Sequence, residues 1–350
     1  MRRKLIAVCI AVVAVIAVFV AWDRVQERRL HKLIEHVAQA GGDADAEARR
    51  AAMTLSDGAS IERLVDHLDD TGPNQEAVVA VLGHIGAPAA GPLVGAARKL
   101  HGWQEPRGFL EGKWEDYWRE VTHPPHTSAP GSAFLPSVLY GTDSRDERLF
   151  AGFTAAFAAI GDPAVADLVA MTKAEDRTTR VLAVSSLVAI RRYADRASRD
   201  AALYKTYSPA AHDVELEAVF TESLKSDDAM MRRAGAFGLM CTPYKNAKGV
   251  LMASLADPDR DVRAFAATAL GRLHASDPDV LERFVSILKD TSADTFLRGV
   301  VAEALASVDD ARVTEALVAA TRDRDTGVAT MAVRSLAPRR ITQPRLQSTD

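Results

Sequence analysis

Apolar residues in the second half of the chain recur with the spacing of one helical face. In the clearest segment, residues 259–273, they fall at offsets of three and four positions from Val262 to Leu273. A turn at residues 275–278 follows, and a second segment with one apolar face then begins. Neither segment can bury its apolar side alone, so the pattern predicts helix pairs that stack on their neighbours.

Four of the predicted units have an Asp at the start of their first helix and an Arg four positions later, and all of them have a Leu or Phe near the end of that helix. The recurrence is about every 30 residues, which predicts an all-α fold: an α-α superhelix, or solenoid of helix pairs, over residues 43–337. Two larger gaps predict insertions at about 102–141 and 192–211. The aligned positions are Leu55, Leu82, Phe157, Leu187, Leu239, Leu270, Leu305 and Leu336.

The Asp/Arg register is predicted to be structural. A carboxylate at a helix start accepts free N–H groups and suits the helix dipole, and the Arg one turn later can reach that carboxylate or the next repeat's loop. A stripe that binds a partner is the alternative. The members of this ladder are Asp176, Arg180, Asp228, Arg232, Asp259, Arg263, Asp294 and Arg298.

The strings Asp257–Arg263 and Ala269–Leu273 resemble the HEAT repeats of bacterial proteins of the phycobilin-lyase-like type. The resemblance covers about residues 44–337 and is strongest from 170 onward. It implies a superhelix that binds other proteins or, in some members, handles bilin-bearing proteins. The chain departs from the pattern in the first repeat and in the last, where Ala329 replaces the Arg.

The amino-terminal segment predicts one transmembrane anchor. A short tail, residues 1–4, precedes an unbroken apolar run at 5–22, which would span roughly 27 Å as a helix. Trp22 then falls where an interfacial aromatic residue is expected. Residues 23–42 are predicted as an amphipathic linker helix. Basic residues flank both sides of the run, and the short tail favours a cytoplasmic N-terminus with the array outside the cytoplasm.

The first insertion concentrates aromatic residues in a chain that has few, since only 6% of its residues are aromatic. This makes the insertion a candidate protein-binding surface, with the alternative that the aromatic residues cover a gap in the core. The second helices around Leu168, Val219, Leu251 and Phe284 are expected to line the inner face of the superhelix. Residues 338–350 lack apolar periodicity and are predicted to be disordered. The candidate binding residues are Trp103, Trp114, Tyr117 and Trp118.

Charge and motif content point away from nucleic acid and catalysis. The formal net charge is −4, with acidic and basic residues mixed and no basic stripe. Two cysteines, Cys9 and Cys241, exclude a disulfide framework and a four-cysteine zinc site. The sequence has no nucleophile elbow, zinc-protease motif or dinucleotide turn. It therefore predicts no catalytic residue, no cofactor and no metal site.

These patterns predict a membrane-anchored repeat scaffold of bacterial type, which binds proteins through its concave face and the Trp-rich insertion and has no catalytic activity. One alternative is a bilin-lyase-like enzyme or enzyme subunit, although a shared fold does not confer an activity. Another is a structural envelope protein that associates with its own copies through the Ala-rich anchor.

Overall fold

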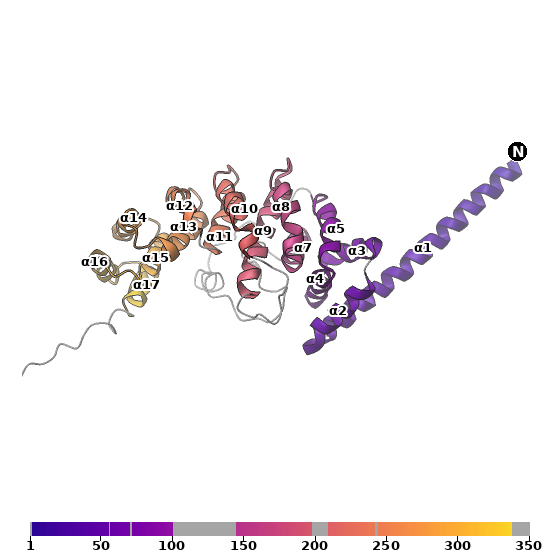
Figure 1. Ribbon diagram of the computed structural model, residues 1–350, viewed down its shortest axis with the longest axis horizontal. Helices are drawn as coiled ribbons and strands as arrows, with labels where there is room; N and C mark the ends of the chain where they lie inside the picture. Colours follow the sequence, from indigo (N-terminus) through magenta and orange to yellow (C-terminus); the bar gives the residue numbers. More distant parts are fainter. Residues whose placement is uncertain are drawn as a thin grey trace, which may run out of the picture. The chain divides into compact units, whose positions relative to one another are not determined.

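The computed structural model describes residues 2–55, 57–70, 72–100, 145–197, 209–241 and 244–337, with side chains omitted at 2–16, 145–147, 192–197, 209–211 and 245. Every regular element in these ranges is helical, which confirms the all-α prediction. Short 3-10 turns (η1–η4) join some helices (Figure 1). The α-helices are α1 (Arg2–Gln39), α2 (Ala44–Thr54), α3 (Gly58–Asp66), α4 (Pro73–Ile85), α5 (Ala87–Ala97), α7 (Arg145–Ile160), α8 (Val165–Met171), α9 (Arg177–Ala197), α10 (Pro209–Ser223), α11 (Ala229–Cys241), α12 (Lys248–Ser254), α13 (Arg260–Leu273), α14 (Pro278–Lys289), α15 (Thr295–Ala304), α16 (Ala311–Ala320) and α17 (Thr326–Leu336).

The chain forms two compact units, Met1–Tyr207 and Ser208–Asp350. In unit 1, the helices α2, α4, α7 and α9 pack on one another in succession, and α3 packs on α5 in a second layer. Phe150 and Phe157 of α7 are fully buried in this stack. Unit 1 therefore has the paired layers of a helical solenoid.

Unit 2 repeats the arrangement. Its first helices α11, α13, α15 and α17 pack in succession, and α14 packs on α16 in the second layer. Rings from consecutive repeats meet in the core, where the Phe237 and Phe265 centroids lie 5.2 Å apart with the rings tilted by 58°. Each repeat thus buries the apolar face of the one before it.

The first helices, not the second, lie on the inner side of unit 2. Figure 1 shows α12, α14 and α16 on the outer side of the curve of this unit, with α13, α15 and α17 inside. The expectation that second helices such as those around Leu251 and Phe284 line the inner face was therefore wrong. The reason is side-chain size: the first helices are rich in Ala and Gly and approach closely, whereas bulkier residues such as Phe284 hold the second helices farther apart.

Glycines mark the closest approaches between first helices in both units. A Cβ atom at Gly271 of α13 would lie 2.6 Å from the Cβ of Ala304 in α15. A Cβ at Gly83 of α4 would lie 2.9 Å from the Cβ of Ala159 in α7. Both distances are too short for a larger residue. The Gly that directly follows the aligned Leu82 or Leu270 therefore sets the spacing between neighbouring first helices.

Helix α1 is continuous from the predicted anchor into the array. The sequence predicted an amphipathic linker helix at 23–42, and the structure has one helix that runs from the apolar segment through this range and ends at Gln39, before Gly41 with φ +56°. Leu30, Ile34 and Val37 of α1 are buried, and the helix packs on α2 and α4. The segment is therefore part of the first repeat layer.

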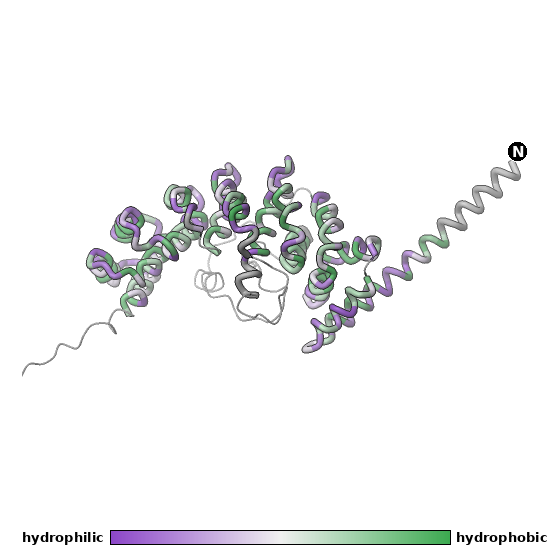
Figure 2. The backbone as a smooth tube through the Cα atoms, in the orientation of Figure 1, coloured by the Kyte–Doolittle hydropathy of each residue, from purple (hydrophilic) through white to green (hydrophobic). Residues whose placement is uncertain are grey.

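The amino-terminal part of α1, where side chains are first described, is apolar and exposed. Val18, Phe19 and Trp22 are 70%, 68% and 59% exposed, and Figure 2 shows this hydrophobic turn followed by turns of mixed character. Within the described side chains, which begin at Ala17 in α1, no single helix is long and apolar enough to cross a membrane. One bent pair, Arg148–Ile160 with Asp162–Met171 at 116°, could do so by length and composition alone.

Several predicted segments fall outside the described residues. These are most of the anchor's side chains, all of the first insertion and the tail from residue 338. The predicted second insertion is helical at both ends, because α9 continues to Ala197 and α10 begins at Pro209. The intervening residues 198–208 are not described.

Candidate functional site: the Asp/Arg ladder

The ladder carboxylates lie at helix N-termini and accept backbone N–H groups. Asp259 Oδ1 accepts from the amides of Asp261 at 3.0 Å and Val262 at 3.1 Å. Asp294 Oδ1 accepts in the same way from Phe296 and Leu297. These bonds satisfy donors that the first helical turn leaves without an intrahelical partner. Asp176, Asp228 and Asp325 cap their helices through Thr179, Met230 and Val328.

The ladder arginines reach backward to the preceding loop. Arg263 Nη1 donates to the carbonyls of Asp257 at 2.8 Å and Pro258 at 3.0 Å. Arg232 donates to the carbonyls of Ser226 and Asp227, and Arg180 to those of Ala174 and Glu175. A guanidinium one turn into each first helix therefore closes the loop that leads into that helix.

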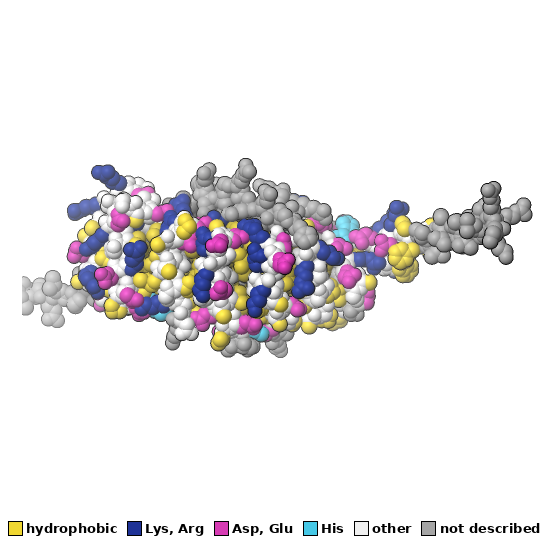
Figure 3. All heavy atoms as spheres, turned by 90° about the horizontal axis from the view of Figure 1, so that it is seen from above, with side chains coloured by type: hydrophobic (Ala, Val, Ile, Leu, Met, Phe, Trp, Pro, Cys, Tyr) yellow, Lys and Arg dark blue, Asp and Glu magenta, His cyan; other side chains and the backbone are white. Residues whose placement is uncertain are grey.

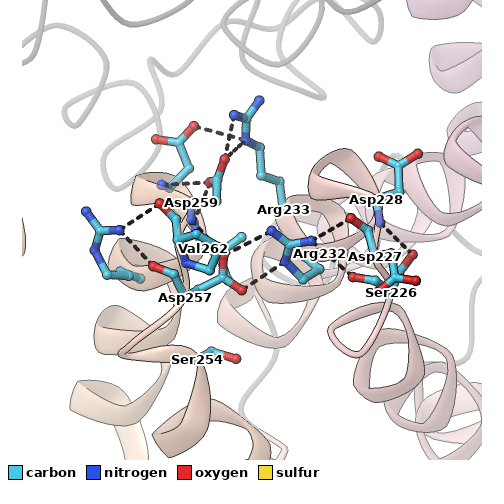
Figure 4. Close-up of polar contacts among 12 residues, drawn as sticks. Ser226, Asp227, Asp228, Arg232, Arg233, Ser254, Asp257, Asp259 and Val262 are labelled. Atoms are coloured by element: carbon cyan, nitrogen blue, oxygen red, sulfur yellow. Dashed lines mark hydrogen bonds and ion pairs between the residues drawn. The ribbon is translucent and has the colours of Figure 1, made fainter.

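In unit 2 the same arginines also reach forward to the next repeat. Arg232 donates to both carboxylate oxygens of Asp257 at 2.9 and 3.2 Å, as Figure 4 shows. Arg263 Nη2 lies 2.8 Å from Asp294 Oδ2. Of the two partners expected from the sequence, the Asp of the same helix and the loop of the next repeat, these side chains bind the second.

Arg298 makes the most buried of these links. Its side chain is 3% exposed, and it donates to the carbonyl of Leu288 and to Asp323, which is 9% exposed. The hydrogen bond from Arg298 lowers the pKa of Asp323 below its usual value, and the amide of Asp325 adds to this effect. The carboxylate is therefore held in its charged form between two repeats.

A second link runs through Arg233, which sequence reasoning missed. Its guanidinium donates to Asp259 Oδ2 at 2.6 and 2.9 Å, and its Nε lies 3.5 Å from the buried Asp261 (Figure 4). Burial by itself would raise the pKa of Asp259, but the hydrogen bond and charge of Arg233, with two amide donors, lower it overall. Asp259 thus caps one helix and anchors the previous one.

Asp257 and Asp323 were also missed, although the sequence carries a signal for them. Each precedes a capping Asp by two residues, and each accepts that residue's backbone N–H, Asp257 from Asp259 at 2.8 Å and Asp323 from Asp325 at 2.9 Å. An Asp-x-Asp string before a first helix therefore marks a loop carboxylate that can receive the preceding repeat's Arg.

Histidines link helices in unit 1, where the sequence had shown them only as scattered singles. His67 Nε2 lies 2.8 Å from Glu27 Oε1 on α1, and His84 Nε2 lies 2.8 Å from Asp45 Oδ1 on α2. His67 Nδ1 also lies 3.3 Å from Asp70. These contacts join α1, α2 and α4 to their neighbours at the amino-terminal end of the array.

Among the described residues, no group of three or more His, Cys, Asp or Glu could hold a metal ion. A hollow of about 360 Å³ on α10 contains charged groups, but Glu222 pairs with Lys225 and Glu217 accepts the amide of Asn246. Figure 3 shows acidic and basic side chains interspersed over the visible face rather than gathered by sign.

The candidate binding residues Trp103, Trp114, Tyr117 and Trp118 lie outside the described residues. Their proposed role therefore stays a prediction.

The repeats of unit 2 are similar to a known family of helical repeats. The family model for HEAT repeats matches residues 216–300 and 247–337. No curated protein sequence matches the chain.

Among solved structures, human deoxyhypusine hydroxylase in complex with glycerol is 16% identical, with a TM-score of 0.32 over 90% of this chain and 97% of that one. A crystallised engineered protein is 18% identical, with a TM-score of 0.32 over 88% of this chain and 95% of that one. Likenesses at this level add nothing to the assignment. The family match and the helix pairs of unit 2 together establish that residues 216–337 of this chain are HEAT repeats.

Proposed function

We propose that this protein is a membrane-tethered HEAT-repeat scaffold that binds other proteins and catalyses no reaction. The observation that carries the proposal is the ladder of unit 2, in which charged groups are used to hold repeats together. Asp259 and Asp294 are each engaged by two amides and a guanidinium, so neither is available as an acid, a base or a metal ligand. These contacts between repeats give unit 2 an ordered surface and a fixed curvature.

The binding surface would be the inner side of the array together with the Trp-rich insertion at 102–141. In unit 2 the inner side is formed by α11, α13, α15 and α17. A stacked array is ordered before a partner arrives, so little conformational entropy opposes binding. Aromatic anchors such as Trp114 and Trp118 supply large contact areas at small entropic cost, which supports a role for the insertion.

The tether would be the apolar run at 5–22 within α1. The exposed Val18, Phe19 and Trp22 support this, since contiguous apolar side chains that are exposed to water mark a surface that contacts a membrane or another protein. We place the N-terminus in the cytoplasm and the array outside it. Protease protection in intact spheroplasts tests this orientation: degradation of the array by external protease supports it, and protection of the array contradicts it.

Deletion of residues 103–140 tests the binding role. The variant should keep nearly all of its helical circular dichroism and lose at least one partner in a membrane pull-down. Deletion of the tail 339–350 is the control and should leave the partners unchanged. A deletion variant that folds and retains every partner would remove the insertion from the proposal.

A further inference from the structure

The charged residues of α1 that follow Trp22 are sorted by side. Asp23 Oδ1 accepts from Arg63 of α3 at 2.9 Å, and Glu27 Oε1 lies 2.8 Å from His67 Nε2. These two carboxylates, four residues apart on one side of the helix, thus face the array and are bound by Arg63 and His67.

Two of the basic residues lie on a different side. Arg24 and Arg28 are also four residues apart, and they follow the two acids by one position each, which turns them about 100° round the helix. Both side chains are exposed and form no ion pair within the part of α1 and its neighbours that the structure describes. The array therefore binds Asp23 and Glu27 and leaves Arg24 and Arg28 facing outward.

These cations directly follow the exposed apolar turn. Along the helix axis Arg24 lies about 3 Å beyond Trp22 and Arg28 about 9 Å, whereas Lys32 on the same side lies about 15 Å beyond it. Electrostatic screening in physiological salt has a length of about 8 Å, so charge near the level of Trp22 acts most strongly on Arg24, less on Arg28 and least on Lys32. Figure 3 shows hydrophobic and basic side chains side by side where the described part of α1 begins.

We propose that Arg24 and Arg28 bind the phosphate groups of anionic phospholipids in the leaflet next to the array. The inference rests on the proposed membrane anchor and adds its lipid partner. A bilayer is favoured over an acidic protein because the cations continue an exposed apolar segment that ends in Trp22, the order expected at a membrane interface. Asp23 and Glu27, which would repel the same lipids, lie on a different side and bind the array.

The test uses Trp22 as a reporter in the full-length chain. Replacement of Trp103, Trp114 and Trp118 by Phe leaves Trp22 as the one indole, and the protein is reconstituted in vesicles of phosphatidylcholine mixed with phosphatidylglycerol. Either lipid is supplied with brominated acyl chains, which quench a nearby indole. If the triple variant loses helicity, the same signal is obtained as the difference between the unaltered chain and its Trp22→Phe variant.

Brominated phosphatidylglycerol should quench Trp22 more strongly than brominated phosphatidylcholine, and high salt should abolish the preference. Replacing both Arg24 and Arg28 by Gln should lower the relative affinity for the anionic lipid, by about fivefold for each guanidinium removed. Lys32→Gln is the matched control: it removes the same charge from the same side, but farther from Trp22, and should change the preference little.

Absence of quenching by either lipid would refute the proposed anchor. Equal quenching by both lipids would leave the anchor standing and overturn the present inference. The inference would also fail if Lys32→Gln removed the preference as fully as the double variant, or if the double variant kept it. A protein that the double variant no longer captures in a pull-down, with lipid preference unchanged, would identify an acidic protein as the partner instead.

Discussion

The two units of this protein link their helices in different ways. In unit 2, Arg232, Arg263 and Arg298 each reach an aspartate of the next repeat. At the amino-terminal end of unit 1, contacts between helices involve His67 with Glu27, His84 with Asp45 and Arg63 with Asp23. The contacts of unit 2 are made by an Arg that recurs at one register, whereas those at the amino-terminal end of unit 1 are not.

The difference follows from repetition. In unit 2, the Arg at the same register of successive repeats contacts an Asp of the next repeat, so the same type of contact recurs along the unit. Unit 1 begins with α1, whose sequence lacks the Asp/Arg register of the repeats, so individual side chains make its contacts with the neighbouring helices. Unit 2 therefore repeats one type of contact, whereas the α1 end of unit 1 depends on contacts that each occur once.

The largest effect should come from breaking the most buried link of unit 2. Arg298→Ala would leave Asp323 and the carbonyl of Leu288 buried without their donor, which should lower the free energy of unfolding by about 3–5 kcal/mol. Urea unfolding measures this. Arg312→Ala removes an exposed Arg that pairs with Asp310 in its own turn, and should change stability little. A similar loss in both variants would contradict the importance of the link between repeats.

Gly271→Val tests whether close helix approach sets the spacing of unit 2. The new side chain would collide with Ala304, and the forced separation should cost about 1–3 kcal/mol in the free energy of unfolding, measured by urea titration. Ala304→Gly in the same chain should recover part of the loss, because it clears the atom that is struck. No recovery in the double variant would assign the cost to another contact.

Arg263→Ala separates a structural ladder from a binding stripe. It removes hydrogen bonds to two loop carbonyls and the pair with Asp294, and should lower the free energy of unfolding by about 1–2 kcal/mol with a lower Tm. Partner capture should persist at temperatures where the variant is folded. Loss of a partner from a variant of unchanged Tm would make the stripe a binding surface.

His67→Ala tests the contact that joins α1 to unit 1. It should weaken docking of residues 23–39 by about 1 kcal/mol, seen as faster amide hydrogen exchange in that segment. His274→Ala removes a similarly buried His that contacts Asp277 within unit 2, and should leave exchange in α1 unchanged. Equal exchange in the two variants would show that apolar packing alone holds α1.

The smallest expected effect is on the stability of the folded state at low pH. Asp259 and Asp323 have folded-state pKa values below their usual values, so the folded state binds fewer protons than the unfolded state. The stabilisation of the folded state by these two carboxylates is complete above their pKa in the unfolded chain, about 3.9. It is lost as the pH falls through their pKa in the folded protein. The stability of Asp259→Asn should therefore decline less steeply than that of the unaltered chain as the pH is lowered below about 4. If the free energy of unfolding fell with pH equally steeply in both proteins, protonation of Asp259 would not be linked to folding.

Local signals predicted the repeat class and the capping residues well. The roles of Asp259 and Asp294 follow from a helix start, which needs an acceptor whatever lies around it. The partners of Arg263 and Arg298 did not follow, because the sequence left open whether an Arg turns to its own helix or to the next repeat. The Asp-x-Asp strings at 257–259 and 323–325 carried a signal for the loop carboxylates that periodicity alone did not reveal.

The sequence by itself determined that helices stack in pairs and where those of unit 2 begin, because periodicity and capping are properties of a few adjacent residues. Only the tertiary structure decided which layer of unit 2 is inner, that α1 continues into the first repeat, and which side of α1 keeps its cations facing outward. Those outcomes depend on how closely small residues such as Gly271 let neighbouring helices approach, and on which carboxylates Arg63 and His67 can reach. Both are distances between segments far apart in the chain, which no local pattern encodes.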